Sequence, residues 1–163
     1  PFYLTWKARE YGVNTRFIEL AGQVNRSMPE YVVERTLLAL NEQGKAVKGS
    51  RILLLGLAYK ADVDDMRESP TFELLSRFAS LGASVAYHDP HIPVIGPTRE
   101  HAEWQGCRSV AWDRATVSSY DAVVIATNHK AVNLAELREW ALLTVDCRDA
   151  MRNIPGKGRV VRA

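Results

Sequence analysis

The stretch that decides the fold is residues 51–70, which read RILLLGLAYKADVDDMRESP. An apolar strand leads into a single glycine, Gly56, and a run of charges follows up to Ser69 and Pro70. This order of strand, turn and helix start is typical of a nucleotide-binding α/β fold. A dinucleotide-binding turn needs three glycines, because its backbone must approach a pyrophosphate closely, and this turn has one. The stretch therefore predicts a nucleotide-binding fold with a different phosphate loop.

Apolar strands and amphipathic segments alternate through the rest of the chain. We expect strands at residues 52–55, 85–87, 109–112, 122–126, 142–145 and 159–161, and helices at 71–81 and 134–140. The strands are nearly continuous apolar runs, as expected when helices cover both faces of a parallel sheet. We therefore predict an α/β fold in which a Rossmann-like parallel sheet of about six strands is flanked by helices.

The first part of the chain has a helical pattern and no predicted strand. One helix is expected to follow Thr15 as its N-cap, and a further helix is expected to open at Pro29 and to end at Gly44. The apolar stripe of that further helix is wider than a half-exposed helix needs, which indicates several packing neighbours, including a dimer partner. We divide the chain into a helical segment, residues 1–46, and an α/β domain, residues 47–163.

Composition excludes several classes of protein. The 163 residues are 47% hydrophobic and 25% charged, and the formal charge of +2 is spread along the chain without a polybasic block for nucleic acid or membrane surfaces. No signal-peptide pattern and no apolar run long enough for a membrane span is present, so the default compartment is cytoplasmic. Cys107 and Cys147 lack CxxC spacing and are interpreted as reduced. The first residue is Pro1 and not Met, which we interpret as the start of a fragment.

The predicted ligand edge of the sheet carries several cationic side chains. Ligands of open α/β sheets bind beyond the carboxyl ends of the strands, where strand order reverses. The loops at residues 57–69, 127–130 and 146–149 follow predicted strands and meet at that edge. Five groups of these loops are candidates to face an anion such as a diphosphate: Lys60, Arg67, His129, Lys130 and Arg148.

Simpler structural roles remain open for parts of this edge. Ser69 and Pro70 fit the N-cap and first position of the following helix. Arg67 has nearby aspartates with which it can pair across a solvated loop, and for Lys60 the two interpretations are equally good. Asp62, Asp64 and Asp65 lack the glycine and the closing glutamate of a calcium loop. His88, Asp89 and His91 are explained equally well by an Asp-Pro turn flanked by exposed histidines, so no metal is predicted.

Longer motifs then identify a family. The run GLAYKADVDDMRESP resembles the signature that opens the C-terminal domain of the UDP-sugar 6-dehydrogenases, the UDP-glucose/GDP-mannose dehydrogenase family. The later segments DPHIP, ATNH and VDCR are similar to that family as well. PFYLTWKAREYG and FIELAGQVNRSMPEYVV resemble the segment after the catalytic cysteine in the branch that acts on UDP-N-acetylhexosamines, and the resemblance leans toward UDP-N-acetylglucosamine.

This resemblance implies a role for the unusual loop. It implies that residues 47–163 form a Rossmann-like lobe that grips the UDP part of a UDP-sugar substrate and needs no three-glycine turn. By position, Tyr59, Lys60 and Arg148 match substrate-binding residues, and Arg67 matches an arginine that reaches the NAD cofactor. The resemblance further implies that NAD is bound mainly by an N-terminal domain upstream of this chain. Residues 1–46 are implied to be part of a central segment through which the enzyme forms a homodimer.

The chemistry of the implied reaction sets a further expectation. Oxidation of a primary alcohol to an acid passes through an aldehyde held on a thiolate, and neither Cys107 nor Cys147 has the surroundings of the family's nucleophile. We therefore expect the nucleophile upstream of Pro1 and no NAD reduction by this chain alone. A stand-alone flavodoxin-like binding or regulatory module is the alternative, and an upstream GxGxxG domain in the reading frame would distinguish the two.

Overall fold

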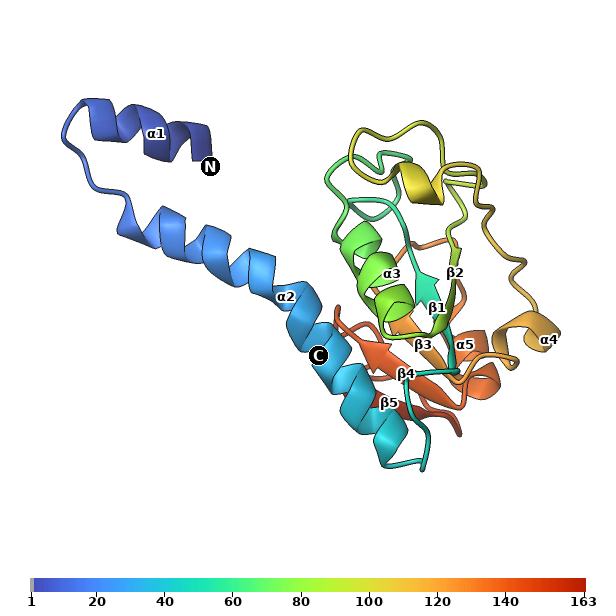
Figure 1. Ribbon diagram of the computed structural model, residues 1–163. Coiled ribbons are helices and arrows are strands. Elements are labelled where there is room, and N and C mark those ends of the chain that lie inside the picture. The colour runs from blue at the N-terminus through green and yellow to red at the C-terminus, as the bar shows by residue number, and fades with distance from the viewer. Residues whose placement is uncertain (1) are drawn as a thin grey trace.

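The computed structural model describes residues 2–163 and places an α/β domain beside a long helical arm (Figure 1). Pro1, the first residue of the predicted helical segment, lies outside the described residues. The helices are α1 (Phe2–Glu10), α2 (Arg16–Asn41), α3 (Pro70–Ser80), α4 (Arg114–Val117) and α5 (Leu134–Trp140), with a 3₁₀ turn at Ala102–Trp104. The strands are β1 (Arg51–Leu55), β2 (Ser84–His88), β3 (Ala122–Ile125), β4 (Leu143–Asp146) and β5 (Arg159–Arg162).

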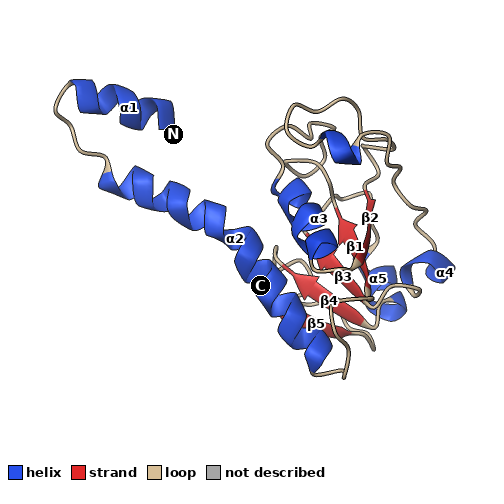
Figure 2. Ribbon diagram, in the orientation of Figure 1, coloured by secondary structure: helices blue, strands red, loops and turns tan. Residues whose placement is uncertain are grey.

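The five strands form one parallel sheet in the order β2-β1-β3-β4-β5, with helices on both sides (Figure 2). The predicted α/β fold with a parallel sheet is therefore confirmed. The sixth strand predicted at residues 109–112 is wrong, because this segment is a loop that crosses the end of β2. Its Val110 N–H donates to the Tyr87 carbonyl at 2.9 Å, while the Ser109 hydroxyl binds the backbone of Asp89 instead of continuing a ladder.

The alternating residues of β1 explain why the strands are apolar throughout. Ile52 and Leu54 join the core with α2 and α3, whereas Leu53 and Leu55 join the core with α4 and α5. All four side chains are completely buried. Burial of an aliphatic side chain stabilises a fold by about 1.5–3 kcal/mol, so both faces of the sheet contribute to stability.

Helix α2 differs from the prediction. The predicted helix start at Pro29 is wrong, because one continuous helix runs from Arg16 to Asn41 with Pro29 inside it. Proline removes one intrahelical hydrogen bond. The helix continues because the turns beyond it pack against α3, β3, β4 and β5, burying Val32 and Leu40. The prediction of several packing neighbours for this part of the helix is confirmed within the chain, and the dimer partner stays a prediction.

Both ends of α2 lie close to the positions that the sequence predicts. Thr15 is the N-cap residue, although its side chain makes no capping hydrogen bond. The helix stops shortly before Gly44, whose φ of +70° closes the C-terminal turn and lets Lys45 N–H donate to the Leu40 carbonyl. The first half of α2 and the whole of α1 project away from the α/β domain (Figure 1). None of the helices in residues 2–163 is long and apolar enough to cross a membrane.

Gly56, directly after β1, is required by a close approach between two strand ends. Its φ is +87°, and a Cβ atom there would lie 2.6 Å from the Thr127 Cβ and against the Thr127 carbonyl. Thr127 follows β3, the neighbour of β1 in the sheet. The single glycine of the sequence motif is thus explained by packing between these two ends.

Gly56→Ala is expected to lower the free energy of unfolding by about 2–5 kcal/mol, because left-handed backbone strain adds to a clash with the main chain. Gly106→Ala is the matched control, since Gly106 has a φ of +81° with open space around it. It should cost only the backbone strain, about 1–2 kcal/mol. Urea denaturation followed by circular dichroism measures both, and equal losses would contradict the close-approach explanation.

Candidate functional site

The candidate site lies at the carboxyl edge of the sheet, between the ends of β1 and β3. From β1 the chain proceeds to β2 on one side, and β3 then pairs with the other side of β1, so strand order reverses here. Open α/β sheets bind ligands at such a point. The Thr127 hydroxyl donates to the Ala58 carbonyl at 2.8 Å and the Thr71 hydroxyl donates to the Gly56 carbonyl at 3.0 Å, so the two ends are tied together.

Asp89 is the centre of the hydrogen bonding at this edge. Its carboxylate is fully buried directly after β2. One oxygen, Oδ2, accepts from Leu57 N–H at 2.7 Å, from Ala58 N–H at 2.9 Å and from His129 Nε2 at 3.0 Å. The other oxygen, Oδ1, accepts from His91 N–H at 2.8 Å and Ile92 N–H at 3.1 Å. One side chain therefore joins the segments that follow β1, β2 and β3.

The charge of Asp89 is stabilised in spite of its burial. Burial alone raises the pKa of this carboxyl, but the backbone donors of Ala58, His91 and Leu57, together with the neighbouring His129, outweigh burial and lower the pKa below its ordinary value. A carboxylate with several N–H donors is a well-known means of holding a negative charge inside a protein. Asp89 is consequently ionised at neutral pH.

His129 lies beneath the edge and not on it. Only 1% of the residue is exposed. Its Nδ1 accepts a hydrogen bond from Asp62 N–H at 3.0 Å, which assigns the ring proton to Nε2, the atom that faces Asp89. His129 is therefore wrong as a candidate to face an anionic ligand, because both ring nitrogens bind partners within the protein.

The four predicted cations are all exposed, but three of them have partners. Arg67 binds Asp65 through two hydrogen bonds of 2.9 Å, and Lys130 Nζ lies 3.3 Å from Asp62 Oδ2. Lys60 Nζ lies 5.6 Å from the centre of the Tyr59 ring, and no carboxylate contacts it among the residues that the structure describes. Lys60 is thus the cation of this loop that is most available to a ligand.

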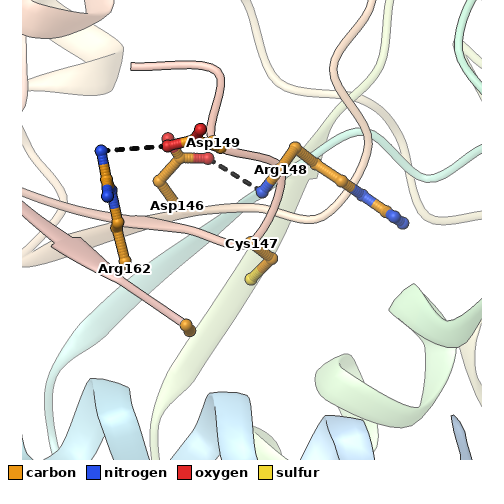
Figure 3. A pocket seen from close by; sticks show the side chains of 6 residues that line it. Asp146, Cys147, Arg148, Asp149 and Arg162 are labelled. Atoms are coloured by element: carbon orange, nitrogen blue, oxygen red, sulfur yellow. Dashed lines mark hydrogen bonds and ion pairs between the residues drawn. The ribbon is translucent and has the colours of Figure 1, made fainter. Parts of the chain in front are cut away.

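Arg148 points toward the reversal of strand order. Its Nε donates to the Ala126 carbonyl, at the end of β3, at 2.6 Å. Figure 3 shows its guanidinium directed away from Arg162 and Asp149, which form an ion pair at 3.2 Å. These residues line a hollow of about 400 Å³ beyond β4 and β5, together with Asp146, Cys147 and Ala163. Arg148 lines this hollow, and its side chain extends from there to the end of β3.

Neither cysteine is placed like an activated nucleophile. Burial raises the pKa of the Cys147 thiol to about 12, so this thiol is protonated at neutral pH. Cys107 is exposed in the loop that follows the 3₁₀ turn, and its carbonyl accepts a hydrogen bond from the Tyr87 hydroxyl. The buried, protonated thiol of Cys147 is therefore unsuited to act as a nucleophile at neutral pH.

A metal ion and a dinucleotide both fit this edge poorly. Asp62, His91 and His129 bring ligand atoms within 4.8 Å of one another, but Asp62 N–H takes the Nδ1 lone pair of His129 and Lys130 takes the Asp62 carboxylate. The turn at Gly56 has no room for a pyrophosphate next to its Cα, because Thr127 fills that space. The turn after β1 is therefore not built as a dinucleotide-binding turn.

The sequence pattern missed the two most connected residues of the edge. Asp89 was interpreted as part of an Asp-Pro turn between exposed histidines, yet Asp89 and His88 are buried. The sequence signal that could have identified Asp89 was an acidic residue two positions after the predicted buried strand at residues 85–87. Thr127 was placed in the correct loop without a role, although its hydroxyl and backbone contact the β1 end.

Comparisons with known proteins agree on one family. The family model described as "UDP-glucose/GDP-mannose dehydrogenase family, UDP binding domain" matches residues 53–153. The UDP-N-acetyl-D-glucosamine 6-dehydrogenase of Salmonella typhi is 26% identical over 130 residues, which cover 80% of this chain and 29% of that protein. The UDP-N-acetyl-D-mannosamine dehydrogenase of Campylobacter jejuni is 32% identical over 119 residues, covering 71% of this chain and 27% of that protein.

A solved structure has the same fold. The UDP-D-ManNAc dehydrogenase of Pyrococcus horikoshii superposes with a TM-score of 0.74 at 22% identity, covering 95% of this chain and 35% of that one. At this identity the likeness concerns the fold. The chain spans about a third of the length of the proteins it matches.

Asp89→Asn is expected to lower the free energy of unfolding at pH 7 by about 2–4 kcal/mol, because an amide NH₂ then faces backbone donors. The folded-state pKa of Asp89 lies below its unfolded value of 3.8, so its stabilisation is fully present above the unfolded value and is lost as the pH falls from there through the folded-state pKa. The difference between the two proteins should therefore narrow from about pH 5 to about pH 3.

Urea denaturation at a series of pH values measures this difference. Asp64→Asn serves as the control, since Asp64 is exposed and changes charge in the same way. A difference between wild type and Asp89→Asn that stays constant down to about pH 3 would contradict the assigned role of the buried carboxylate.

Proposed function

This chain belongs to the UDP-glucose/GDP-mannose dehydrogenase family and contains its UDP-binding domain, and from that premise we propose that the edge between β1 and β3 binds the diphosphate of a UDP-sugar. The observation that carries the proposal is the exposed, unpaired ammonium of Lys60 on a loop anchored at the reversal of strand order. A cation held by a rigid edge is suited to an anionic ligand.

Tyr59 supports Lys60 in this role. The ring is 48% exposed, and Tyr59 N–H donates to the Asp65 carbonyl at 2.8 Å, which closes the loop into a compact turn. The aromatic face and the ammonium are therefore presented from neighbouring positions of a fixed turn. We assign both residues to the substrate, the lysine to its charge and the tyrosine to an apolar face of the nucleotide or sugar.

Arg148 and Arg67 join the proposed site from its two sides. Arg148 belongs to the substrate end, because its side chain already extends to the Ala126 carbonyl beside the β1 loop. Arg67 lies on the outer rim with 85% of its side chain exposed, and we assign it to the NAD cofactor of the complete enzyme. Its neighbour Asp65 has a pKa lowered to about 2 by hydrogen bonds from Arg67, which come from Nε and Nη2 and leave the Nη1 donors for NAD.

The proposed reaction is the oxidation of the sugar 6-hydroxyl to a carboxylate. NAD supplies the hydride acceptor in such a reaction, with two molecules reduced for each four-electron oxidation. We propose UDP-N-acetylglucosamine as the substrate, supported by the name of the Salmonella typhi relative. The Campylobacter jejuni relative is named for the C2 epimer, so a comparison of the two UDP-sugars tests this choice. The nucleophilic thiolate and the main NAD site are assigned to segments outside this chain, because the Cys147 thiol is buried and protonated.

We further propose a homodimer through the helical segment, residues 1–46, beside the UDP-binding domain, residues 47–163. Part of the stripe predicted on α2 packs on the chain's own sheet, whereas the projecting half of α2 exposes apolar side chains. Phe17 is 88% exposed and Val24 is 49% exposed on this half. Apolar patches of this kind are uncommon on monomers.

Light scattering should therefore find a dimer for the wild-type chain. The double variant Phe17→Asp/Val24→Asp should be a monomer that keeps its fold by circular dichroism, because both residues lie outside the α/β core. Gln23→Asp, an exposed position of the same helix, is the control and should remain dimeric. A monomeric wild type at high concentration would reject the proposed dimer.

Lys60→Ala should weaken UDP binding about ten- to a hundredfold, because a charge-assisted contact is worth about 1.5–3 kcal/mol. Isothermal calorimetry with UDP measures the affinity, and thermal melting checks the fold. The control is Lys157→Ala, which removes an exposed lysine before β5, at the opposite edge of the sheet. Unchanged UDP affinity in Lys60→Ala would remove Lys60 from the site, and a wild-type chain without measurable affinity would reject UDP binding itself.

A further inference from the structure

We propose that Asp62 and His129 are positioning residues that hold the Tyr59–Lys60 turn over the strand ends, and we name Asp62, Asp89 and His129 the loop latch. The inference rests on the proposed function, since it concerns the loop that carries Lys60. It explains why an acidic loop occupies the place of a glycine-rich one.

The latch joins the loop to the sheet by reciprocal hydrogen bonds. Asp62 N–H donates to His129 Nδ1 at 3.0 Å, and the Asp62 carboxylate accepts from Lys130 N–H at 2.9 Å. His129 Nε2 in turn donates a hydrogen bond to the buried Asp89 carboxylate, which also accepts from the N–H groups of Leu57 and Ala58. The turn at Tyr59 and Lys60 is therefore fixed on both sides, at Ala58 by Asp89 and at Asp62 by His129.

The backbone at Asp62 indicates that this arrangement is maintained against a local cost. Asp62 has a φ of +61°, which is unfavourable for residues other than glycine and least so for aspartate and asparagine. Strained positions persist when surrounding contacts determine them. Here those contacts are the two hydrogen bonds to the segment after β3.

Ion pairs within the loop and with Lys130 determine which charge of the loop is available to a ligand. Three aspartates close to Lys60 would repel a diphosphate if all pointed at it. Asp62 is turned to Lys130, and Asp65 is turned to Arg67, so two of the three carboxylates are compensated by their own cations. The ammonium of Lys60 is left as the available charge of the turn.

Two substitutions of His129 each keep one of its two ring hydrogen bonds and remove the other. In His129→Asn the amide oxygen takes the place of Nδ1 and still accepts from Asp62 N–H. In His129→Gln the amide nitrogen takes the place of Nε2 and still donates to Asp89, but the acceptor for Asp62 N–H is lost.

Amide hydrogen exchange by NMR reports the latch without any ligand. In His129→Gln the Asp62 amide should exchange at least about tenfold faster, while the Leu57 and Ala58 amides stay protected. In His129→Asn the Asp62 amide should keep its protection. Equal exchange of the Asp62 amide in wild type and His129→Gln would overturn the latch.

UDP affinity then tests positioning. Asp62→Ala should weaken UDP binding about fivefold, with Lys60 intact, because the turn is released. Asp62→Asn should retain affinity within about twofold, because it keeps the acceptor for Lys130 N–H and tolerates the positive φ. Asp64→Ala is the control that removes a carboxylate of the same loop without removing a latch contact.

The possible outcomes distinguish failure of the loop latch from failure of the proposed UDP site. Weaker UDP binding in Asp62→Ala and His129→Gln, with recovery in Asp62→Asn, supports positioning. Unchanged UDP affinity in both, at normal wild-type affinity, overturns positioning even if melting temperatures fall. If the wild-type chain binds no UDP, the proposed function fails, and the exchange of the Asp62 amide still decides whether the latch exists.

Discussion

The buried carboxylate of Asp89 is the interaction on which the edge of the sheet depends. Parallel strands end in loops whose backbone N–H groups lack ladder partners, and a buried N–H without an acceptor destabilises a fold. Asp89 supplies acceptors for backbone donors that follow both β1 and β2, and for the ring of His129 after β3. Loops from three strands are thereby fixed relative to one another, and a binding edge is formed without a glycine-rich turn.

The use of a buried carboxylate in place of a glycine-rich turn determines which groups at the edge can bind an anion. A glycine-rich turn binds phosphate with backbone N–H groups at a helix N-terminus. Here the N–H groups of Leu57 and Ala58 are already used by Asp89. Recognition of an anion then falls to side chains. The loop presents Lys60 without a carboxylate partner, while its acidic residues Asp62 and Asp65 pair with Lys130 and Arg67. The acidic character of the loop is thus compatible with an anionic ligand.

The sequence was sufficient where contacts are local and insufficient where they are distant. The range of α5 and the Ser69 N-cap of α3 were predicted from neighbouring residues, and both are confirmed. The break at Pro29 was wrong because tertiary packing of α2 overrides the local preference of proline. Asp89 was missed because the partners that give it its role, Leu57, Ala58 and His129, lie 32, 31 and 40 residues away in the sequence. No spacing rule relates residues that only the sheet brings together.

The same distinction applies to the candidate site residues. Lys60, Tyr59, Arg67 and Arg148 were predicted from motif position, and the structure brings their loops to the β1 and β3 ends without testing what they bind. His129 was a candidate from its position at the same edge alone, and its ring points inward because it hydrogen-bonds to Asp89. A motif therefore identifies which loop belongs to a site, while the direction of each side chain follows from the buried acceptor beside it. In this chain the exposed residues at the edge are suited to contact a ligand, and the buried ones to hold the exposed residues in place.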